Sequence, residues 1–174
     1  MSIRFWLAIS LFACTSSLHA QAVPTATRRG DLQVGIGYSF AQPDYGTTTF
    51  KGIAAYTAFD FTPHFGAEFD FRLLKDPSPE QLYEKTYEVG VRYRRTYGRF
   101  VPYGKVMVGR GVFNYQNGLA NLAYNMYALG GGVDYRIRPY LSVRGDFEFQ
   151  KWLGFPPHDL TPMVETIGVA YHFR

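Results

Sequence analysis

The feature that most constrains this chain is a two-residue alternation of apolar and polar side chains, which recurs from residue 31 to the end. From Phe65 to Leu73 the odd positions are apolar, and Glu68, Asp70 and Arg72 fall between them. Successive side chains of a β-strand point to opposite faces of the sheet, so this period predicts strands with one apolar and one polar face. The predicted fold class is therefore all-β.

The alternation recurs in eight stretches, for which we expect strands of about 10 to 13 residues, longer than the five or six typical of soluble sheets. Such lengths suit tilted strands that cross a bilayer. The stretches lie near residues 31–40, 49–60, 65–73, 87–94, 101–113, 124–136, 141–149 and 166–173. Short turns with Pro or Gly at 61–64, 96–99 and 137–139 alternate with longer polar loops at 41–48, 75–84, 114–123 and 151–162. Short turns at one rim and long loops at the other are typical of outer-membrane barrels.

Alternation alone is compatible with an apolar face turned inward, as in a small soluble exported barrel, or outward to lipid. Three features favour lipid. Small residues share the polar face, where they would leave room for long charged chains in a narrow barrel: Gly35, Gly37, Gly66, Gly90, Gly109, Gly111, Gly130, Gly132 and Gly168. Aromatic residues end the apolar face, as at a membrane interface: Tyr38, Phe40, Tyr93, Tyr135, Phe149, Tyr171 and Phe173. The chain also ends on an alternating aromatic strand.

Residues 1–22 predict a secretory signal peptide, with Arg4 before a short apolar core and cleavage after Ala20 or Ala22. A short segment, 23–30, would then precede a barrel domain at 31–174. The sole cysteine, Cys14, lies in the signal; it partly resembles a lipoprotein box, but we favour a hydrophobic residue of the signal core. Loss of Arg4 lowers the net charge from +4 to +3. Export and the interleaving of bases with acids argue against nucleic-acid binding.

Together these features resemble the small eight-stranded outer-membrane β-barrels, the family of the outer membrane protein A transmembrane domain and the opacity proteins. The resemblance implies an antiparallel up-and-down barrel with periplasmic turns and termini, surrounded by outer-membrane lipid and lipopolysaccharide. The last strand resembles the assembly signal that the barrel insertion machinery reads, at Ile167, Val169, Tyr171 and Phe173. The chain departs from the family pattern by ending on Arg174 rather than on the aromatic residue.

The predicted lumen carries six acidic and six basic residues: Glu68, Asp70, Arg72, Glu88, Arg92, Arg94, Lys105, Asp134, Arg136, Arg144, Asp146 and Glu148. An eight-stranded barrel is only wide enough for its own side chains, and buried charges require partners. We therefore favour a salt-bridged plug, with a structural or surface-interaction role for the protein. The alternative is a small ion-conducting pore.

The other two candidate functions are adhesion and modification of lipid A. Trp152 and Phe155, in a predicted outer loop, are candidates for binding an unidentified extracellular ligand or host factor as an adhesin. A lipid A-modifying enzyme would need a Ser-His-acid set. The histidines His64, His158 and His172 are scattered and show no such pattern, so we expect no enzyme. Separated histidines and a single cysteine also predict no metal site, and no cofactor motif is present.

Overall fold

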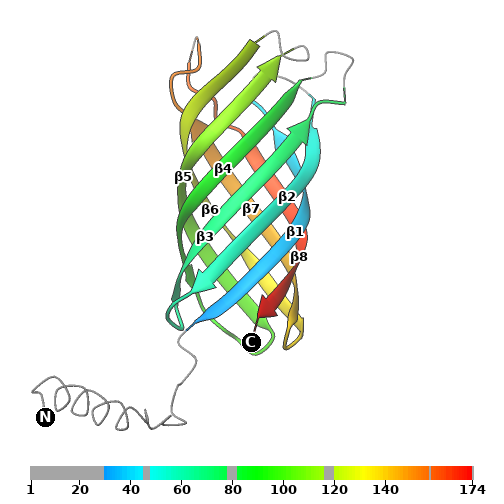
Figure 1. Ribbon diagram of the computed structural model, residues 1–174, viewed down its shortest axis with the longest axis vertical. Helices are drawn as coiled ribbons and strands as arrows, with labels where there is room; N and C mark the ends of the chain where they lie inside the picture. Colours follow the sequence, from blue (N-terminus) through cyan, green and yellow to red (C-terminus); the bar gives the residue numbers. More distant parts are fainter. Residues whose placement is uncertain (1–29, 45–47, 78–81, 116–119, 157, 174) are drawn as a thin grey trace, which may run out of the picture.

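The computed structural model describes residues 30–44, 48–77, 82–115, 120–156 and 158–173. The predicted signal peptide, Cys14 and all but the last residue of segment 23–30 lie outside the described residues. Eight antiparallel strands form one closed barrel in chain order (Figure 1). They are β1 Asp31–Gln42, β2 Phe50–Asp60, β3 Phe65–Lys75, β4 Tyr83–Arg94, β5 Phe100–Tyr115, β6 Ala120–Arg138, β7 Leu141–Trp152 and β8 Met163–Phe173.

The barrel closes where β1 pairs antiparallel with β8, from Leu32 opposite Phe173 to Gln42 opposite Met163. In hydrocarbon an unpaired backbone N–H or C=O costs several kcal/mol, so closure removes sheet edges that lipid would otherwise meet. β1 begins and β8 ends at the same end of the barrel, beside the short turns (Figure 1). In the described part of the chain, no helix is long and apolar enough to span a membrane.

The two faces of the sheet point as predicted, with apolar side chains outside and charged ones inside. Ile36 and Leu129 on the outer face are 66% and 64% exposed, whereas Glu68 and Arg92 inside are each 1% exposed. An apolar outer band is stable only against lipid, and buried charges need partners, so these numbers exclude the soluble orientation. The predicted aromatic residues at the strand ends also lie on the outer face.

The strand boundaries differ from the prediction at both ends of β6. Residues 114–123 were predicted as a loop, but β5 and β6 pair up to Tyr115 opposite Ala120. The turn predicted at 137–139 is also shorter, because β6 continues to Arg138 through a register shift after Arg136. Gly- and Ala-rich alternation is weak, so backbone pairing extends these strands beyond the point where side-chain pattern marks them.

Two inward glycines show why small residues share the lumen face. A Cβ added at Gly35 would lie 2.2 Å from the ring of Tyr56, and one at Gly111 would lie 2.5 Å from the ring of Trp152. Real Cβ atoms do not approach that closely, so each glycine makes room for one large aromatic side chain: Tyr56 on the adjacent strand for Gly35, and Trp152 for Gly111.

Candidate functional site

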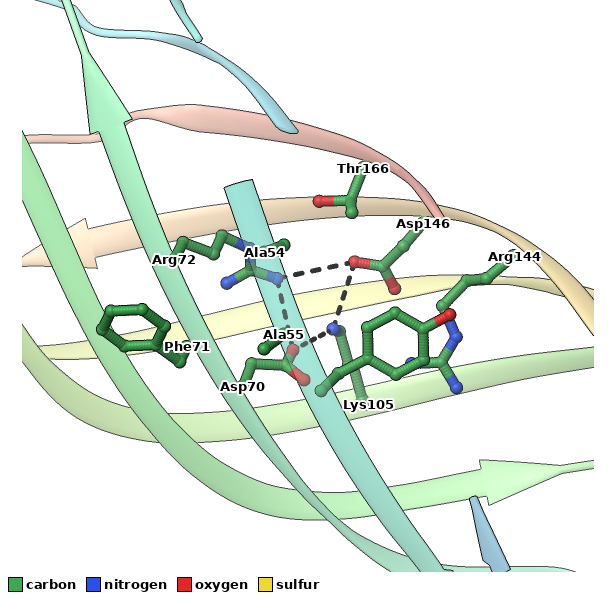
Figure 2. Close-up of a pocket in the computed structure, with 10 residues that line it drawn as sticks. Ala54, Ala55, Asp70, Phe71, Arg72, Lys105, Arg144, Asp146 and Thr166 are labelled. Atoms are coloured by element: carbon green, nitrogen blue, oxygen red, sulfur yellow. Dashed lines mark hydrogen bonds and ion pairs between the residues drawn. The ribbon is translucent and has the colours of Figure 1, made fainter. Parts of the chain in front are cut away.

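The centre of the lumen is built around the ammonium group of Lys105 on β5. Its Nζ lies 2.7 Å from Asp70, 3.1 Å from both Asp146 and Glu148, and 3.2 Å from Glu68, all measured to carboxylate oxygens. The carboxylates come from β3 and β7, and alternation turns each of them inward. Figure 2 shows Lys105 pointing between Asp70 and Asp146, with Arg72 on the other side of both. One cation therefore ties opposite walls of the barrel together.

Nearer the loops, Arg72 makes a second set of bonds. Its Nη1 and Nη2 donate to the two carboxylate oxygens of Glu148 at 3.1 and 3.0 Å, and Nη1 also donates to Glu88. The Gln150 amide donates to Glu88 at 3.1 Å and to Glu148 at 2.8 Å. A guanidinium held by carboxylates from two sides is fixed in one geometry, since its donors form a rigid planar fork.

Nearer the turns, Arg144 and Arg92 share the carboxylates of Glu68 and Asp134. Arg144 donates to Asp134 at 2.8 and 3.2 Å and to Glu68 at 3.0 Å, and Arg92 donates to Glu68 at 2.9 Å. With its amide oxygen facing them, Gln33 accepts from both guanidiniums. The Arg144 guanidinium also lies 4.1 Å from the ring centre of Tyr56. Each buried guanidinium is thus compensated by carboxylates and by an amide or an aromatic face.

One small void lies within the polar network. This void of about 10 Å³ lies beside Tyr56, Asp70 and Arg72, which suits at most one water molecule (Figure 2). Among the described residues, the Tyr56 hydroxyl and Asp70 Oδ1 have no hydrogen-bond partner, so both can bond a water there. A hydrated ion is several times larger than this void.

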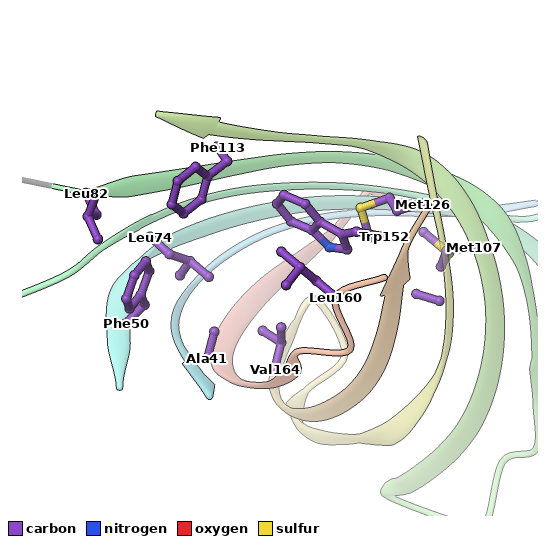
Figure 3. Packing of buried hydrophobic residues seen from close by; sticks show 11 residues of the cluster. Ala41, Phe50, Leu74, Leu82, Met107, Phe113, Met126, Trp152, Leu160 and Val164 are labelled. Carbon is purple, nitrogen blue, oxygen red and sulfur yellow. The ribbon is translucent and has the colours of Figure 1, made fainter. Parts of the chain in front are cut away.

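Above the charges, a layer of apolar side chains closes the loop end of the lumen. We call it the apolar cap (Figure 3). It consists of Ala41, Phe50, Leu74, Leu82, Met107, Phe113, Met126, Ala128, Trp152, Leu160 and Val164. Leu160 enters it from the β7–β8 connection, which pairs with Trp152 through backbone bonds of 2.8 and 3.1 Å. The cap therefore combines barrel side chains with a loop folded over the mouth.

The prediction that Trp152 is exposed in an outer loop is wrong. It ends β7, its side chain is fully buried in the apolar cap, and its Nε1 donates to Gln150 at 3.0 Å. Phe155 is half-buried against Phe113 and Tyr124, with ring centres 5.8 and 5.1 Å apart. Burial removes the apolar surface of the indole from water, and the bond to Gln150 satisfies its N–H there.

The loop that carries Leu160 is fastened at both ends. The backbone N–H and hydroxyl of Thr161 donate to the Asp44 carboxylate at 2.8 and 2.9 Å, which ties this loop to the β1–β2 loop. The backbone N–H of Gly154 donates to Asp159 at 2.8 Å, and this bond lowers the pKa of the Asp159 carboxyl. The bond from Gly154 stabilises the carboxylate form of Asp159, and together with the bonds to Asp44 it holds the loop across the mouth.

The structure brings eleven of the twelve predicted lumen charges to the interior, and the twelfth, Arg136, is a correction. Its side chain is 27% exposed at the turn-side rim, 4.0 Å from Asp31. Arg136 lies near the turn-side end of β6, where its long side chain reaches the rim and water. Arg94 lies just inside that rim, 3.1 Å from Asp60.

Sequence reasoning missed three buried partners. Asp60 ends the predicted strand 49–60 but was not predicted among the lumen charges; it is 2% exposed and accepts from Arg92 at 3.1 Å. Glu84, predicted in a loop, is 3% exposed on β4. Tyr103 donates to Asp146 at 2.6 Å. Alternation within the predicted strands 49–60 and 101–113 places Asp60 and Tyr103 inside, and extending the strand predicted at 87–94 by three residues does the same for Glu84. With them counted, the buried carboxyl groups outnumber the buried cations.

A Ser-His-Asp arrangement lies at the turn-side end of the lumen. Ser142 Oγ lies 3.0 Å from His172 Nε2, and His172 Nδ1 lies 3.2 Å from Asp31 Oδ2. These distances match those of a hydrolase triad. Ser142, however, has no exposed surface, so its hydroxyl is closed to substrate in this conformation. Among the described residues, no three His, Cys, Asp or Glu side chains are arranged to hold a metal ion.

A model of the outer membrane protein beta-barrel domain matches residues 9–173. The chain belongs to this family. Outer-membrane β-barrel proteins carry their short turns on the periplasmic side and their longer loops outside the cell, so the apolar cap faces outward and the Ser-His-Asp group faces the periplasm. The protein is thus a β-barrel of the outer membrane of Gram-negative bacteria. No curated protein matches the chain.

Solved structures of outer-membrane barrels superpose on nearly the whole described chain. Neisserial surface protein A has a TM-score of 0.69 at 10% identity, covering 83% of this chain and 97% of that one. Ail of Yersinia pestis, solved with the heparin analogue sucrose octasulfate, has a TM-score of 0.63 at 19% identity, covering 83% and 99%. OprG of Pseudomonas aeruginosa has a TM-score of 0.63 at 14% identity, covering 83% and 96%. At these identities the likeness establishes the fold alone.

Proposed function

We propose that this outer-membrane barrel is a non-conducting protein that acts structurally or through its outer surface. The observation that carries the proposal is the double closure of the lumen. Lys105 and the arginines fill the middle with ion pairs, and the apolar cap with Trp152 seals the outward mouth. An ion would have to displace several buried charge pairs and then cross the apolar cap, and each step is unfavourable by several kcal/mol.

Planar-bilayer recording of the refolded protein tests this proposal. We expect no steady conductance from the native chain, with a porin of known conductance in the same bilayer as the positive control. Arg92→Gln and Glu88→Gln are the matched variants, because both side chains belong to the lumen network. Steady native conductance that shifts in either variant would contradict the closed lumen and establish the small pore instead.

We propose lipopolysaccharide as the lipid partner at the outward rim. Four basic residues face outward near the loop ends of neighbouring strands: Lys51, Lys75, Lys85 and Arg110. Lys51 lies directly opposite Lys75, where two like charges repel. Phosphate groups of lipopolysaccharide would relieve that repulsion, and they lie at this level of the outer leaflet.

We expect lipopolysaccharide to raise the melting temperature of the detergent-solubilised barrel. This increase should be smaller in the double variant Lys51→Gln/Lys75→Gln. Lys151→Gln is the control, because this lysine is already paired with Asp159 at 3.4 Å. Equal stabilisation by a lipid A preparation without phosphates would contradict recognition through these lysines.

We further propose that the assembly machinery reads the last strand. Ile167, Val169, Tyr171 and Phe173 face outward from β8 and are 46% to 64% exposed, so a partner in the membrane can contact all four. We expect Phe173→Ser to slow folding into outer membranes more than Met163→Ser at the other end of the same face. Equal effects of the two substitutions would argue against a terminal signal.

We also propose that the protein is not an enzyme, because the Ser142 hydroxyl is enclosed. Expression should leave the mass of lipid A unchanged, and Ser142→Ala should behave as the native chain. Release of acyl groups that stops in Ser142→Ala would identify a hydrolase that opens in the membrane.

A further inference from the structure

The lipid-facing surface has an apolar groove of about 300 Å³ near the periplasmic end of the β4–β5 hairpin. Its floor is Gly104, and its walls are the side chains of Phe65, Val91, Tyr93, Val106 and Leu129, all of which face outward. Phe65 and Tyr93 pack edge to face, with ring centres 5.2 Å apart, and form the periplasmic wall. Such an apolar groove, open on the lipid side, is suited to an acyl chain.

Packing within the chain does not explain the glycine in the groove floor. A Cβ built on Gly104 would meet only the Gly130 carbonyl oxygen, at the ordinary distance of 3.9 Å. Glycine weakens a strand, and where its own neighbours leave room it marks the close approach of something else. Here the approaching group comes from the lipid side, because Gly104 faces outward.

A cation is held at the periplasmic end of the groove. Arg95 Nε donates to the Tyr93 hydroxyl at 3.0 Å, so the groove wall itself positions the guanidinium. Hydrogen bonds to Tyr97 and Tyr93 raise the pKa of Arg95, which is fully exposed. Within the described residues it makes no ion pair with a carboxylate, so its charge is available to an anionic group from outside the chain.

We propose that this groove and Arg95 form a binding site for one anionic phospholipid of the periplasmic leaflet. An acyl chain lies over Gly104 between Val91 and Leu129, and the phosphate accepts hydrogen bonds from the guanidinium. Arginine matches a phosphate with two parallel donors, and the Tyr93 ring between groove and guanidinium lies at the depth where a lipid joins its chain to its headgroup. The site is independent of whether the lumen conducts.

Native mass spectrometry of the full-length protein, extracted in a mild detergent, tests the proposal with phosphatidylglycerol and phosphatidylcholine added at equal concentration. One basic side chain near the surface favours an anionic lipid about fivefold. We expect one retained phosphatidylglycerol at about that preference over phosphatidylcholine. Arg95→Gln should lower the preference to about one, whereas Arg138→Gln, another exposed arginine of this rim, should leave it unchanged.

The groove is tested by filling it. Gly104→Leu should abolish retention of both lipids, and Leu129→Trp, from the exposed wall on β6, should do the same if the first variant folds poorly. Gly145→Leu is the control, because Gly145 also has open space outside but lies on β7, away from the groove. Equal retention of the two lipids by the native chain, an unchanged preference in Arg95→Gln, or retention in both filled variants equal to that of Gly145→Leu would each overturn the proposal.

Discussion

Replacement of Lys105 by methionine removes a cation that contacts four carboxylates, each of which keeps at least one arginine partner. Its Nζ lies 2.7 to 3.2 Å from these groups, and its side chain is 1% exposed. Removal of one partner of a buried ion pair costs about 3–5 kcal/mol, because the other charge stays buried without compensation. With four carboxylates affected we expect about 4 kcal/mol. For an m-value of about 2 kcal/mol/M, the urea midpoint of the barrel in lipid vesicles should fall by roughly 2 M.

Two further variants make the reasoning refutable. Lys51→Met removes an exposed outward lysine and should change stability by less than about 0.5 kcal/mol. Asp70→Asn neutralises the carboxylate nearest to Lys105, so adding it to Lys105→Met should recover at least about 1 kcal/mol. A loss below about 1 kcal/mol in Lys105→Met, or additive losses in the double variant, would show that the network does not compensate its buried charges in this way.

Three other predictions concern packing and the loop. Gly35→Val should cost about 1–3 kcal/mol, because its side chain would overlap the Tyr56 ring; a smaller loss on urea unfolding would contradict that contact. Trp152→Ala should cost about 3–5 kcal/mol by leaving a cavity in the apolar cap, and a neutral effect in the same assay would place the indole outside. The pKa of Asp159 is lowered, so its bond from Gly154 is present above about pH 4 and lost as pH falls further; the Gly154 amide proton should shift upfield on acidification in micelles, and a constant shift would refute the bond.

Alternation carried most of the fold prediction because it is a local property. It placed Glu68, Asp70 and Arg72 on one face from their neighbours alone. The small and aromatic residues then predicted which face meets lipid and which lines the lumen. It failed where a strand ends. Trp152 follows Glu148 and Gln150 at two-residue spacing, so alternation would continue the strand through it. The Pro-rich stretch after Trp152 instead favoured a loop from residue 151, before the strand ends.

Partnerships across the lumen depend on register and shear, which a local pattern does not contain. Arg72 and Asp146 lie on β3 and β7, and the sequence holds no signal that their levels in the barrel match. The same holds for Ser142, His172 and Asp31, which come from three strands. Only closure of β1 on β8 brings the last two together, so the triad-like geometry emerged from the structure alone.

The orientation of the two faces is tested most directly by single-cysteine accessibility in lipid vesicles. Val108 is 58% exposed on the outer face, and its neighbour Met107 is fully buried in the lumen. With Cys14 replaced by serine, a spin label at Val108→Cys should be relaxed by oxygen dissolved in the lipid and not by a water-soluble nickel complex, whereas Met107→Cys should be shielded from both. Relaxation of the Val108→Cys label by the nickel complex, with the Met107→Cys label relaxed by lipid-dissolved oxygen, would show that the apolar face does not meet the membrane.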